Sequence, residues 1–364
     1  MKTEKIRGTH SLNTIRSVLA ILVLAAAFLF VPTGQSLATD NGVRLMTRNV
    51  YQGVNFDDLL DSTSQFELLV AAGAAYNSIV DSKPSARMAA IAREIVRNRV
   101  DLVGLQEMVI LRKGPSQLTN PFTPATDVEF DFMQLLLKEL QRLGHRYHVV
   151  AIVPGVDAQL PTLLGFDARL TVSDAIIARS HSSVALSNVQ VQGFLVDRDF
   201  TALGGAVRIA NPRGWASVDV QVDGRKFRFA TTHLETPDFP AQPLQAFDMI
   251  EGAGDTTLPV VFVGDFNAVV GDALGTYQRF VTAGFKDAWT RKRPLLPGYT
   301  CCQAANLLNP TSLLNQRIDL ILFRGAFVVD DIRLVGEKPS DRIPPGLWPS
   351  DHAGVVATLR IPRH

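Results

Sequence analysis

A short apolar run that ends in polar side chains, at residues 260–267, constrains the possible folds of this chain most. The segment Val-Val-Phe-Val predicts a buried strand, because β-branched and aromatic residues favour strands. Gly264 follows and allows the backbone to turn or to approach a ligand closely. Asp265 and Asn267 are two residues apart, so in an extended strand their side chains point the same way. Gly, Asp and Asn are also common turn residues, and this segment alone leaves a site and a turn equally open.

The same arrangement recurs along the chain, where polar residues stand at the ends of predicted apolar strands. Polar residues follow the predicted strands at 43–48, 100–106 and 226–232. Polar residues precede the predicted strands at 320–323 and 355–361. A turn or a solvated surface explains each residue singly, but strand ends on one rim of a sheet are where rigid sites are built. Besides Asp265 and Asn267, the residues concerned are Asn49, Glu107, His233, Asp319, Asp351 and His352.

Segments with helical periodicity separate these strands. Helices are predicted within 57–80 and at 85–99, 131–143, 243–252 and 273–283. Asp272 is the predicted N-cap of the last of these helices. In the helix at 85–99, Arg87, Arg93 and Arg97 are interpreted as a solvated face.

Loops are predicted at 110–130, 154–167 and 290–315, where Pro, Gly and polar residues gather. Strands outnumber helices, and hairpins mix with strand–helix–strand units. The sequence therefore predicts a single α/β domain built on packed sheets.

The first 38 residues have the pattern of a secretory signal peptide. A basic start precedes an unbroken apolar run at 18–31, and small residues at Ser36 and Ala38 predict cleavage after Ala38. A retained membrane anchor is the alternative, but the run is short for a bilayer. We expect a secreted or periplasmic, monomeric protein of residues 39–364, with no transmembrane segment in the mature chain.

Charge and cysteine content narrow the possible partners. Removing residues 1–38, which hold four basic residues and one acidic residue, takes the formal charge from +1 to −2. This is not the charge of a tight nucleic-acid binder, although a local basic groove is still compatible with a nuclease. Cys301 and Cys302 are adjacent, which suits neither a disulfide scaffold nor a zinc site and leaves a vicinal disulfide open.

The polar residues at the strand ends fit metal-assisted cleavage of a phosphate ester. Oxygen ligands such as Asn49, Glu107 and Asp351 suit Mg²⁺ or Mn²⁺. Asp265 and Asn267 can orient an attacking water and the phosphoryl oxygens.

A histidine can supply positive charge in the same reaction. Asp319 can fix the tautomer of His352 and raise its pKa, and a protonated His352 would stabilise the developing phosphorane. The chain has no serine nucleophile elbow and no Gly-rich phosphate loop, which favours this chemistry over the alternatives.

Six segments resemble, in order, the motifs of the endonuclease/exonuclease/phosphatase superfamily, and they span nearly all of 43–361. The resemblance implies an α/β (α+β) fold, a four-layer α/β sandwich in which helices flank two central, mostly antiparallel sheets. It also implies that residues 39–364 form one domain of this family. The segments are Thr47-Arg48-Asn49-Val50, Leu105-Gln106-Glu107, Thr232-His233-Leu234, Gly264-Asp265-Phe266-Asn267, Arg317-Ile318-Asp319 and Ser350-Asp351-His352.

The same resemblance implies roles at the matching positions. Asn49 and Glu107 would serve the divalent metal, with Asp351 next to it. Asp265 and Asn267 would position water and phosphate.

The remaining roles implied by the resemblance concern histidines. Asp319 would support His352 as base or charge stabiliser. His233 is similar to the histidine of the deoxyribonuclease, sphingomyelinase and inositol-phosphatase branches, and would contact phosphate or protonate the leaving oxygen. Arg169 is a candidate phosphate contact.

Three functions compete at this point. The first is a secreted, divalent-metal-dependent phosphodiesterase that acts on a phospholipid headgroup, an inositol phosphate or another small phosphoester. The second is a secreted nuclease on DNA or RNA, which the alternating basic and aromatic residues at 226–229 suggest. The third is a catalytically silent binding protein on the same fold, which the complete set of polar residues disfavours.

Overall fold

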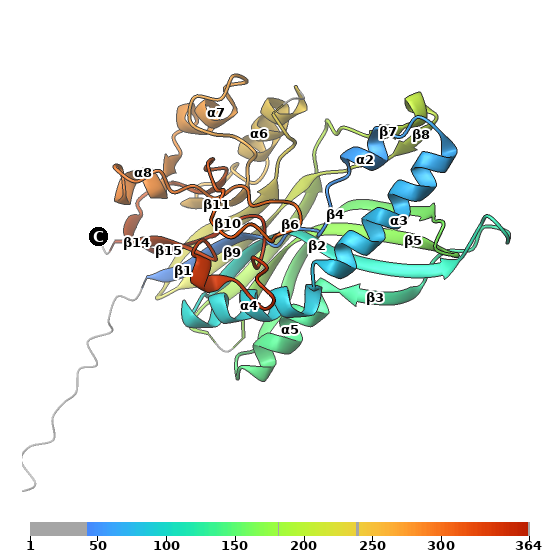
Figure 1. Cartoon of the computed structure of the whole chain (residues 1–364). Coiled ribbons are helices and arrows are strands. Elements are labelled where there is room, and N and C mark those ends of the chain that lie inside the picture. The colour runs from blue at the N-terminus through green and yellow to red at the C-terminus, as the bar shows by residue number, and fades with distance from the viewer. Residues whose placement is uncertain (1–41, 181, 238–239, 363–364) are drawn as a thin grey trace, which may run out of the picture. The chain divides into compact units, whose positions relative to one another are not determined.

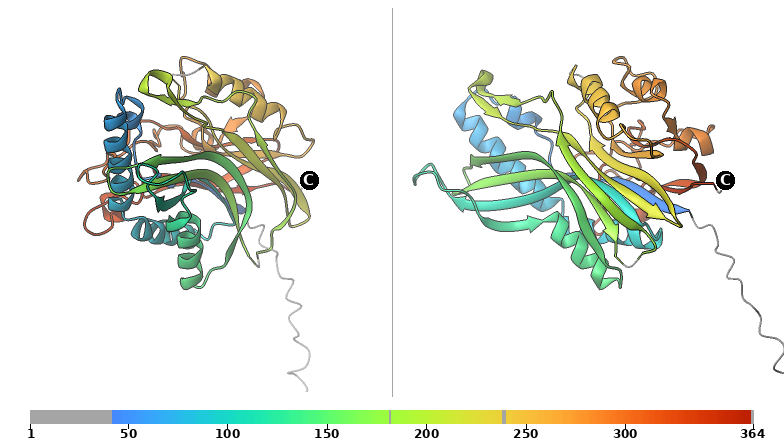
Figure 2. Two further views of the ribbon diagram at one scale, coloured as in Figure 1. Left: turned by 90° about the vertical axis from the view of Figure 1, so that its right-hand side faces the viewer. Right: turned by 180° about the vertical axis from the view of Figure 1, so that it is seen from behind.

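Two mixed sheets pack face to face and form the centre of the structure (Figures 1 and 2). The computed structural model describes residues 42–180, 182–237 and 240–362, so the predicted signal peptide lies outside the described residues. The seven-stranded sheet has the order β14-β15-β1-β2-β5-β4, with β3 paired to β2. The six-stranded sheet has the order β12-β13-β11-β10-β9-β6. Among the described residues, β1–β2 and β10–β11 are parallel and the other pairs are antiparallel.

The seven-stranded sheet contains β1 (Val43–Asn49), β2 (Leu102–Pro115), β3 (Asp127–Asp131), β4 (Tyr147–Pro161), β5 (Phe166–Arg179), β14 (Val328–Val335) and β15 (Gly354–Arg360). The six-stranded sheet contains β6 (Ala185–Gly193), β9 (Gly214–Val222), β10 (Arg225–His233), β11 (Val260–Asp265), β12 (Lys286–Asp287) and β13 (Asp319–Arg324). A separate small hairpin is formed by β7 (Phe200–Ala202) and β8 (Val207–Ile209).

Helices cover the outer faces of both sheets, as predicted for this fold class. The α-helices are α2 (Asp57–Leu60), α3 (Gln65–Asp81), α4 (Pro84–Arg97), α5 (Phe132–Arg142), α6 (Ala241–Glu251), α7 (Thr276–Thr282) and α8 (Ala288–Lys292). Short 3₁₀ turns lie at Leu203–Gly205 and Pro339–Asp341. One apolar cluster joins α3, α4 and α5 to the seven-stranded sheet, and another joins α6 and α7 to the six-stranded sheet. None of the helices in the described residues is long and apolar enough to cross a membrane.

Strand β11 is uniformly apolar because both of its faces are buried. Val261 and Val263 point into the core between the sheets, whereas Val260 and Phe262 pack under α6 and α7. The Phe262 ring stacks on Phe285 with the ring centroids 4.5 Å apart. Each such side chain contributes roughly 1.5–3 kcal/mol by leaving water. This burial fixes the strand that leads directly into Asp265.

The predicted loop at 154–167 is largely wrong and the one at 110–130 is reduced to 116–126, because the strands beside them are longer than predicted. Strand β2 continues to Pro115, and β4 continues to Pro161, so most of 154–167 belongs to the β4–β5 hairpin. The register of β4 against β5 shifts between Pro154 and Asp157. Such a bulge accommodates Pro and Gly within a strand, and for this reason their presence did not end it.

Two predictions about helices also need correction. Arg87 is fully buried rather than solvated, and it donates to the carbonyl oxygens of Ser82, Val50 and Tyr51. Helix α7 begins at Thr276, not at 273, although Asp272 still accepts from the Thr276 backbone N–H at 2.7 Å.

Gly264 does not end β11 but allows it to approach β10 closely. A Cβ atom at this position would lie 2.2 Å from the Thr232 carbonyl oxygen. We therefore expect Gly264→Ala to lower the free energy of unfolding by roughly 1–3 kcal/mol, as overpacking does. Urea unfolding followed by circular dichroism measures this change.

Gly73→Ala in α3 is the matched control for this substitution. Its Cβ would meet Leu164 at an ordinary 3.5 Å, so we expect equal or higher stability, by up to about 1 kcal/mol. Wild-type stability of Gly264→Ala would contradict the close packing of β10 against β11.

Candidate active site

Polar side chains from both sheets meet at one end of the sandwich. Strands β1 and β2 are parallel, as are β10 and β11, so their carboxyl ends lie at the same edge. The register pairs His233 with Asp265 and Asp265 with Asp319. The last strand, β15, is antiparallel to β1, and this brings the segment 350–352 that precedes β15 beside Asn49.

Asp319 and His352 form a buried pair. The Nδ1 atom of His352 lies 2.8 Å from Asp319 Oδ2, which fixes the tautomer with Nδ1 as donor. Nε2 is directed to the other side, 3.8 Å from Asp265 Oδ2 and 4.0 Å from Asp351 Oδ1. Burial opposes the charged imidazolium, but attraction from Asp319, Asp351 and Asp265 outweighs it and raises the His352 pKa well above its usual value.

Asn49 links two carboxylates from different sheets. Its Nδ2 donates to Glu107 Oε1 at 2.9 Å and to Asp265 Oδ2 at 3.1 Å. The Tyr51 backbone N–H donates to Asn49 Oδ1 at 2.9 Å, and this bond sets the orientation of the amide. The backbone N–H of Gln52 donates to Glu107 Oε2 at 2.7 Å.

Glu107 reaches the site from a bulge and not from a strand end, contrary to the prediction. It has a φ of 62°, and the register of β2 against β5 shifts between Leu105 and Met108. The backbone N–H of Glu107 donates to Asp174 Oδ1 at 3.2 Å. A bulge adds one residue on one strand and redirects a side chain, so β2 can continue while Glu107 faces Asn49.

Asn267 also differs from the prediction, since it does not continue the strand. Its φ of 48° lies in the left-handed region, which Asn tolerates. The backbone N–H donates to Asp265 Oδ1 at 3.0 Å, and Nδ2 donates to the Leu234 carbonyl at 3.0 Å. Asn267 therefore holds the Asp265 carboxylate in place through its backbone.

His233 lies at the end of β10 between two carboxylates. Its Nε2 is 3.6 Å from Asp265 Oδ2, and its Nδ1 is 3.8 Å from Asp174 Oδ1. Burial and the neighbouring Arg213 lower the His233 pKa, but Asp265 and Asp174 outweigh them and raise it above its ordinary value.

The chain segment around Asp351 is held by buried hydrogen bonds. Ser350 Oγ donates to the Asn49 carbonyl at 2.8 Å, and the Gln303 N–H donates to the Asp351 carbonyl at 2.7 Å. Burial raises the pKa of Asp351, and the negative charges of Glu107 and Asp265 raise it further, while His352 opposes this.

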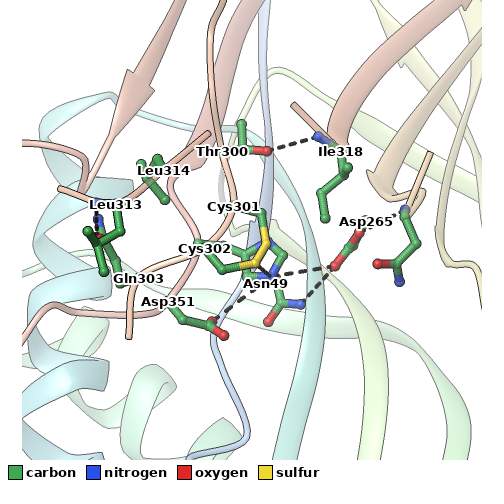
Figure 3. Close-up of a disulfide and its surroundings, with 12 residues drawn as sticks. Asn49, Asp265, Thr300, Cys301, Cys302, Gln303, Leu313, Leu314, Ile318 and Asp351 are labelled. Atoms are coloured by element: carbon green, nitrogen blue, oxygen red, sulfur yellow. Dashed lines mark hydrogen bonds and ion pairs between the residues drawn. A yellow bond between two sulfur atoms is a disulfide. The ribbon is translucent and has the colours of Figure 1, made fainter. Parts of the chain in front are cut away.

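Cys301 and Cys302 are bonded to each other as a vicinal disulfide, the alternative that the sequence left open. Cys302 Sγ lies 3.9 Å from His352 Nε2, so the loop that carries the disulfide forms one wall of the site. Thr300 Oγ1 accepts from the backbone N–H groups of Ile318 and Asp319 and anchors this loop to β13. Figure 3 shows the disulfide, the Asn49–Asp265 bond and the Thr300–Ile318 bond.

Some residues near the site were not among those predicted. Asp174 and Arg213 line a polar cleft together with Glu107 and His233. Asp174 directly precedes the apolar run 175–178, as Asp319 precedes 320–323, so the same pattern could have identified it. Arg213 precedes a strand without any such signal. The candidate phosphate contact Arg169 instead pairs with Asp157 across the β4–β5 hairpin.

The donor atoms fit a hard divalent cation. Glu107, Asp265 and Asp351 are carboxylates gathered at one end of the sandwich, and Asp319 Oδ1 has no hydrogen-bond partner within the described part of the chain. Oxygen ligands of this kind suit Mg²⁺ or Mn²⁺, and a cation would offset their mutual repulsion. A tighter group of possible ligand atoms is formed by Asp265, Asp319 and His352, all within 4.8 Å. Because Asp319 and His352 already bond each other, we favour Glu107 and Asp351 as ligands.

Comparisons with known proteins agree with this geometry. The sequence model of the endonuclease/exonuclease/phosphatase family matches residues 77–352. A family protein from Leptotrichia buccalis is 14% identical, with a TM-score of 0.56, over 87% of this chain and 99% of that one. TDP2 from D. rerio, complexed with a single-strand DNA product, is 17% identical, with a TM-score of 0.53, over 87% and 98%.

A third solved structure is a mannosyl-6-phosphatase from Bacteroides thetaiotaomicron, 18% identical with a TM-score of 0.50 over 87% of this chain and 99% of that one. No curated protein matches this chain in sequence. At these identities the solved structures show a shared fold and leave the substrate open.

The Asp319–His352 pair predicts a particular pH dependence. Because the His352 pKa is raised, the imidazolium persists at neutral pH and is lost as the pH rises through that pKa. Asp319→Asn removes the largest attraction, so we expect the alkaline limb of kcat/KM against pH to move to lower pH. Asp331→Asn, whose carboxylate pairs with Arg293 and Arg333, is the control. An alkaline limb that stays in place in Asp319→Asn would contradict the role of this pair.

Proposed function

The chain belongs to the endonuclease/exonuclease/phosphatase family, whose members are metal-dependent phosphoester hydrolases, and we propose that it is a secreted phosphodiesterase that uses Mg²⁺ or Mn²⁺. The family match agrees with the resemblance seen in the sequence motifs. The predicted signal peptide of residues 1–38 supports export to the periplasm or the exterior. The substrate we favour is a phospholipid headgroup, an inositol phosphate or another small phosphoester.

The observation that carries this proposal is the buried His352–Asp319 pair, with Nε2 directed toward Asp265. A cationic imidazole held there can stabilise the negative charge that develops on a phosphoryl oxygen. Asp265 receives one hydrogen bond on each oxygen, from Asn49 and from the Asn267 backbone. Each oxygen keeps a further lone pair for a water, so the carboxylate can orient the attacking nucleophile.

His233 provides a second proton donor beside the same carboxylate. Its raised pKa keeps it protonated at neutral pH more often than a free histidine. A protonated imidazole can donate to the leaving oxygen as the phosphoester bond breaks. Asp174, 3.8 Å from Nδ1, would orient the ring for this transfer.

A divalent cation would be held by Glu107, Asp351 and Asn49 in this proposal. When bound, it supplies positive charge to the phosphoryl oxygens and lowers the pKa of a coordinated water. Glu107 is positioned for this by the Gln52 N–H and Asn49, which fix both of its oxygens.

A nuclease is the second candidate, and the fold likeness to D. rerio TDP2 keeps it open. The basic and aromatic alternation at 226–229 does not favour it. Phe227 and Phe229 are core residues between the sheets, and Arg228 pairs with Asp219. Only Lys226 of this segment is exposed, so no basic face with aromatic side chains forms there.

A panel assay tests the proposed function and separates it from the nuclease. The substrates are bis-para-nitrophenyl phosphate, sphingomyelin and plasmid DNA, each with Mg²⁺ or EDTA. We expect EDTA-sensitive hydrolysis of the first two. Nicking of the plasmid without hydrolysis of the others would favour the nuclease, and inactivity on all three would argue for a silent binding protein.

Two substitutions test the assigned roles on bis-para-nitrophenyl phosphate. Asp265→Asn and His352→Ala should each lower kcat/KM by at least about 10²-fold, the low end for a positioned acid, base or charge-stabilising group. Near-wild-type rates in both variants, with folding verified by circular dichroism, would refute these roles.

A third substitution tests the cation site. Glu107→Gln keeps the shape of the side chain but removes its charge, so we expect half-maximal activity at a much higher Mg²⁺ concentration. Glu129→Gln, an exposed partner of Lys113, is the matched control. A Mg²⁺ titration that is identical in Glu107→Gln and wild type would remove Glu107 from the ligands.

A further inference from the structure

An apolar groove opens beside the candidate active site. It is formed by α2, α3, β4 and β5, with β7 and β8 on one side, and these elements lie together in Figure 1. Its volume is about 570 Å³, including the open mouth. Leu59, Ala75, Ile79, Leu160 and Leu170 are among the lining residues, and no residue that lines it carries a formal charge at neutral pH.

The groove adjoins the polar cleft of the active site. Phe56, Val156 and Phe200 line both, and the rings of Phe56 and Phe200 lie 6.2 Å apart at the junction. Beyond these residues the cleft, of about 470 Å³, leads to Glu107 and His233. A molecule whose phosphate lies at the carboxylates would therefore have to pass only these three side chains to reach the groove.

Strand β5 shows the same change from apolar to polar along its length. Ala168 and Leu170 line the groove, Val172 and Ser173 line the cleft, and Asp174 faces His233. Strand β4 changes in parallel, with Leu160 in the groove and Gly155 in the cleft. One hairpin thus presents an apolar surface and a catalytic surface in succession.

Exposed apolar residues follow the groove-lining strand β4 in the chain. Leu163 and Leu164, in the β4–β5 turn that follows Leu160, are 50% and 43% exposed. Exposed apolar residues that continue a groove lined by apolar side chains provide a route along which a hydrocarbon chain stays out of water.

Because the apolar groove adjoins the polar cleft, we propose that the substrate is an amphiphilic phosphoester, with its phosphate at the carboxylates and a hydrocarbon chain in the groove. The inference rests on the proposed phosphoesterase function and adds the class of substrate to it. Sugars and nucleosides fit the groove poorly, because their hydroxyl and amide groups would be buried there without partners. A hydrocarbon chain has no polar groups that lose hydrogen bonds to water when it enters the groove, and burial of its apolar surface is favourable.

A homologous series of alkyl para-nitrophenyl phosphodiesters, from methyl to octyl, tests the proposal with the full-length mature protein and Mg²⁺. We expect kcat/KM to rise with chain length, by up to about fourfold for each methylene that enters the groove. A flat profile with rapid hydrolysis of the methyl ester would overturn the groove proposal alone. No metal-dependent hydrolysis of any ester would instead overturn the proposed function.

Two adjacent alanines of α3 provide a matched pair of variants. Ala75 lines the groove, whereas Ala74 is exposed and does not. Ala75→Phe should reduce the ratio of octyl to methyl kcat/KM at least about tenfold, the equivalent of excluding two methylenes. Ala74→Phe should keep the wild-type ratio. Ala168→Leu fills the same groove from β5 and serves if Ala75→Phe folds poorly. Wild-type ratios in both folded groove variants would overturn the proposal.

A comparison of monomeric dihexanoyl phosphatidylcholine with phosphatidylcholine vesicles shows whether the hydrocarbon chain comes from a free amphiphile or from a lipid surface. Hydrolysis of either form supports the proposal. Leu164→Asp would slow the reaction on vesicles alone if the chain is drawn from a lipid surface, and would affect neither if it comes from a free amphiphile. A kcat/KM for plasmid DNA or mannose 6-phosphate above that for the octyl ester would contradict an amphiphilic substrate.

Discussion

The gathering of carboxylates at one end of the sandwich is the constraint on which the rest of the structure depends. Removing an ionised carboxylate from water costs several kcal/mol unless charge and hydrogen bonds compensate. Asn49 donates to two of these carboxylates, and His352 has Nε2 directed toward two. The pKa of Asp351 is nevertheless raised by burial and by its acidic neighbours, so the protein alone does not balance this charge. A hard divalent cation would complement this charge, and the imbalance that costs stability without the cation would then provide affinity for it.

The two sheets create this concentration of charge through their connections. Parallel pairing of β1 with β2 and of β10 with β11 brings strand ends to one edge, and the antiparallel β13 and β15 begin there. Side chains alternate along a strand, so an unbroken β2 would fix the direction of Glu107 by register alone. The bulge opposite β5 removes this restriction, so β2 can place apolar side chains in the core and Glu107 in the site. The long β2 and β5 strands can then continue to the apolar groove without losing the carboxylate.

Much of this could be predicted from sequence because it depends on local pattern. The run 260–263 predicts a strand buried on both faces, and Asp319 before its apolar strand predicts a polar group at a rim. What could not be predicted depends on contacts between distant segments. The bulge at Glu107 exists only against β5, and Arg87 is buried because carbonyl groups from residues 50 and 51, distant in sequence, surround it. The sequence predicts an extended conformation for Asn267, but its left-handed turn is set by hydrogen bonds to Asp265 and Leu234.

Most groups assigned to bond cleavage lie on other elements than the groove, although β2 and β5 contribute to both. The groups assigned to bond cleavage are on β1, β2, β10, β11 and β13 and on the segment before β15, where two-sided packing fixes them. The groove that would hold a hydrocarbon chain is closed by α2, α3 and the β7–β8 hairpin, which cover the β4–β5 hairpin from outside. We expect a substitution in these covering elements to change the shape of the groove without moving Asp265 or His352. If the groove holds part of the substrate, substrate preference can change while the reaction stays the same, because among the described residues the two linings share Phe56, Val156 and Phe200 alone.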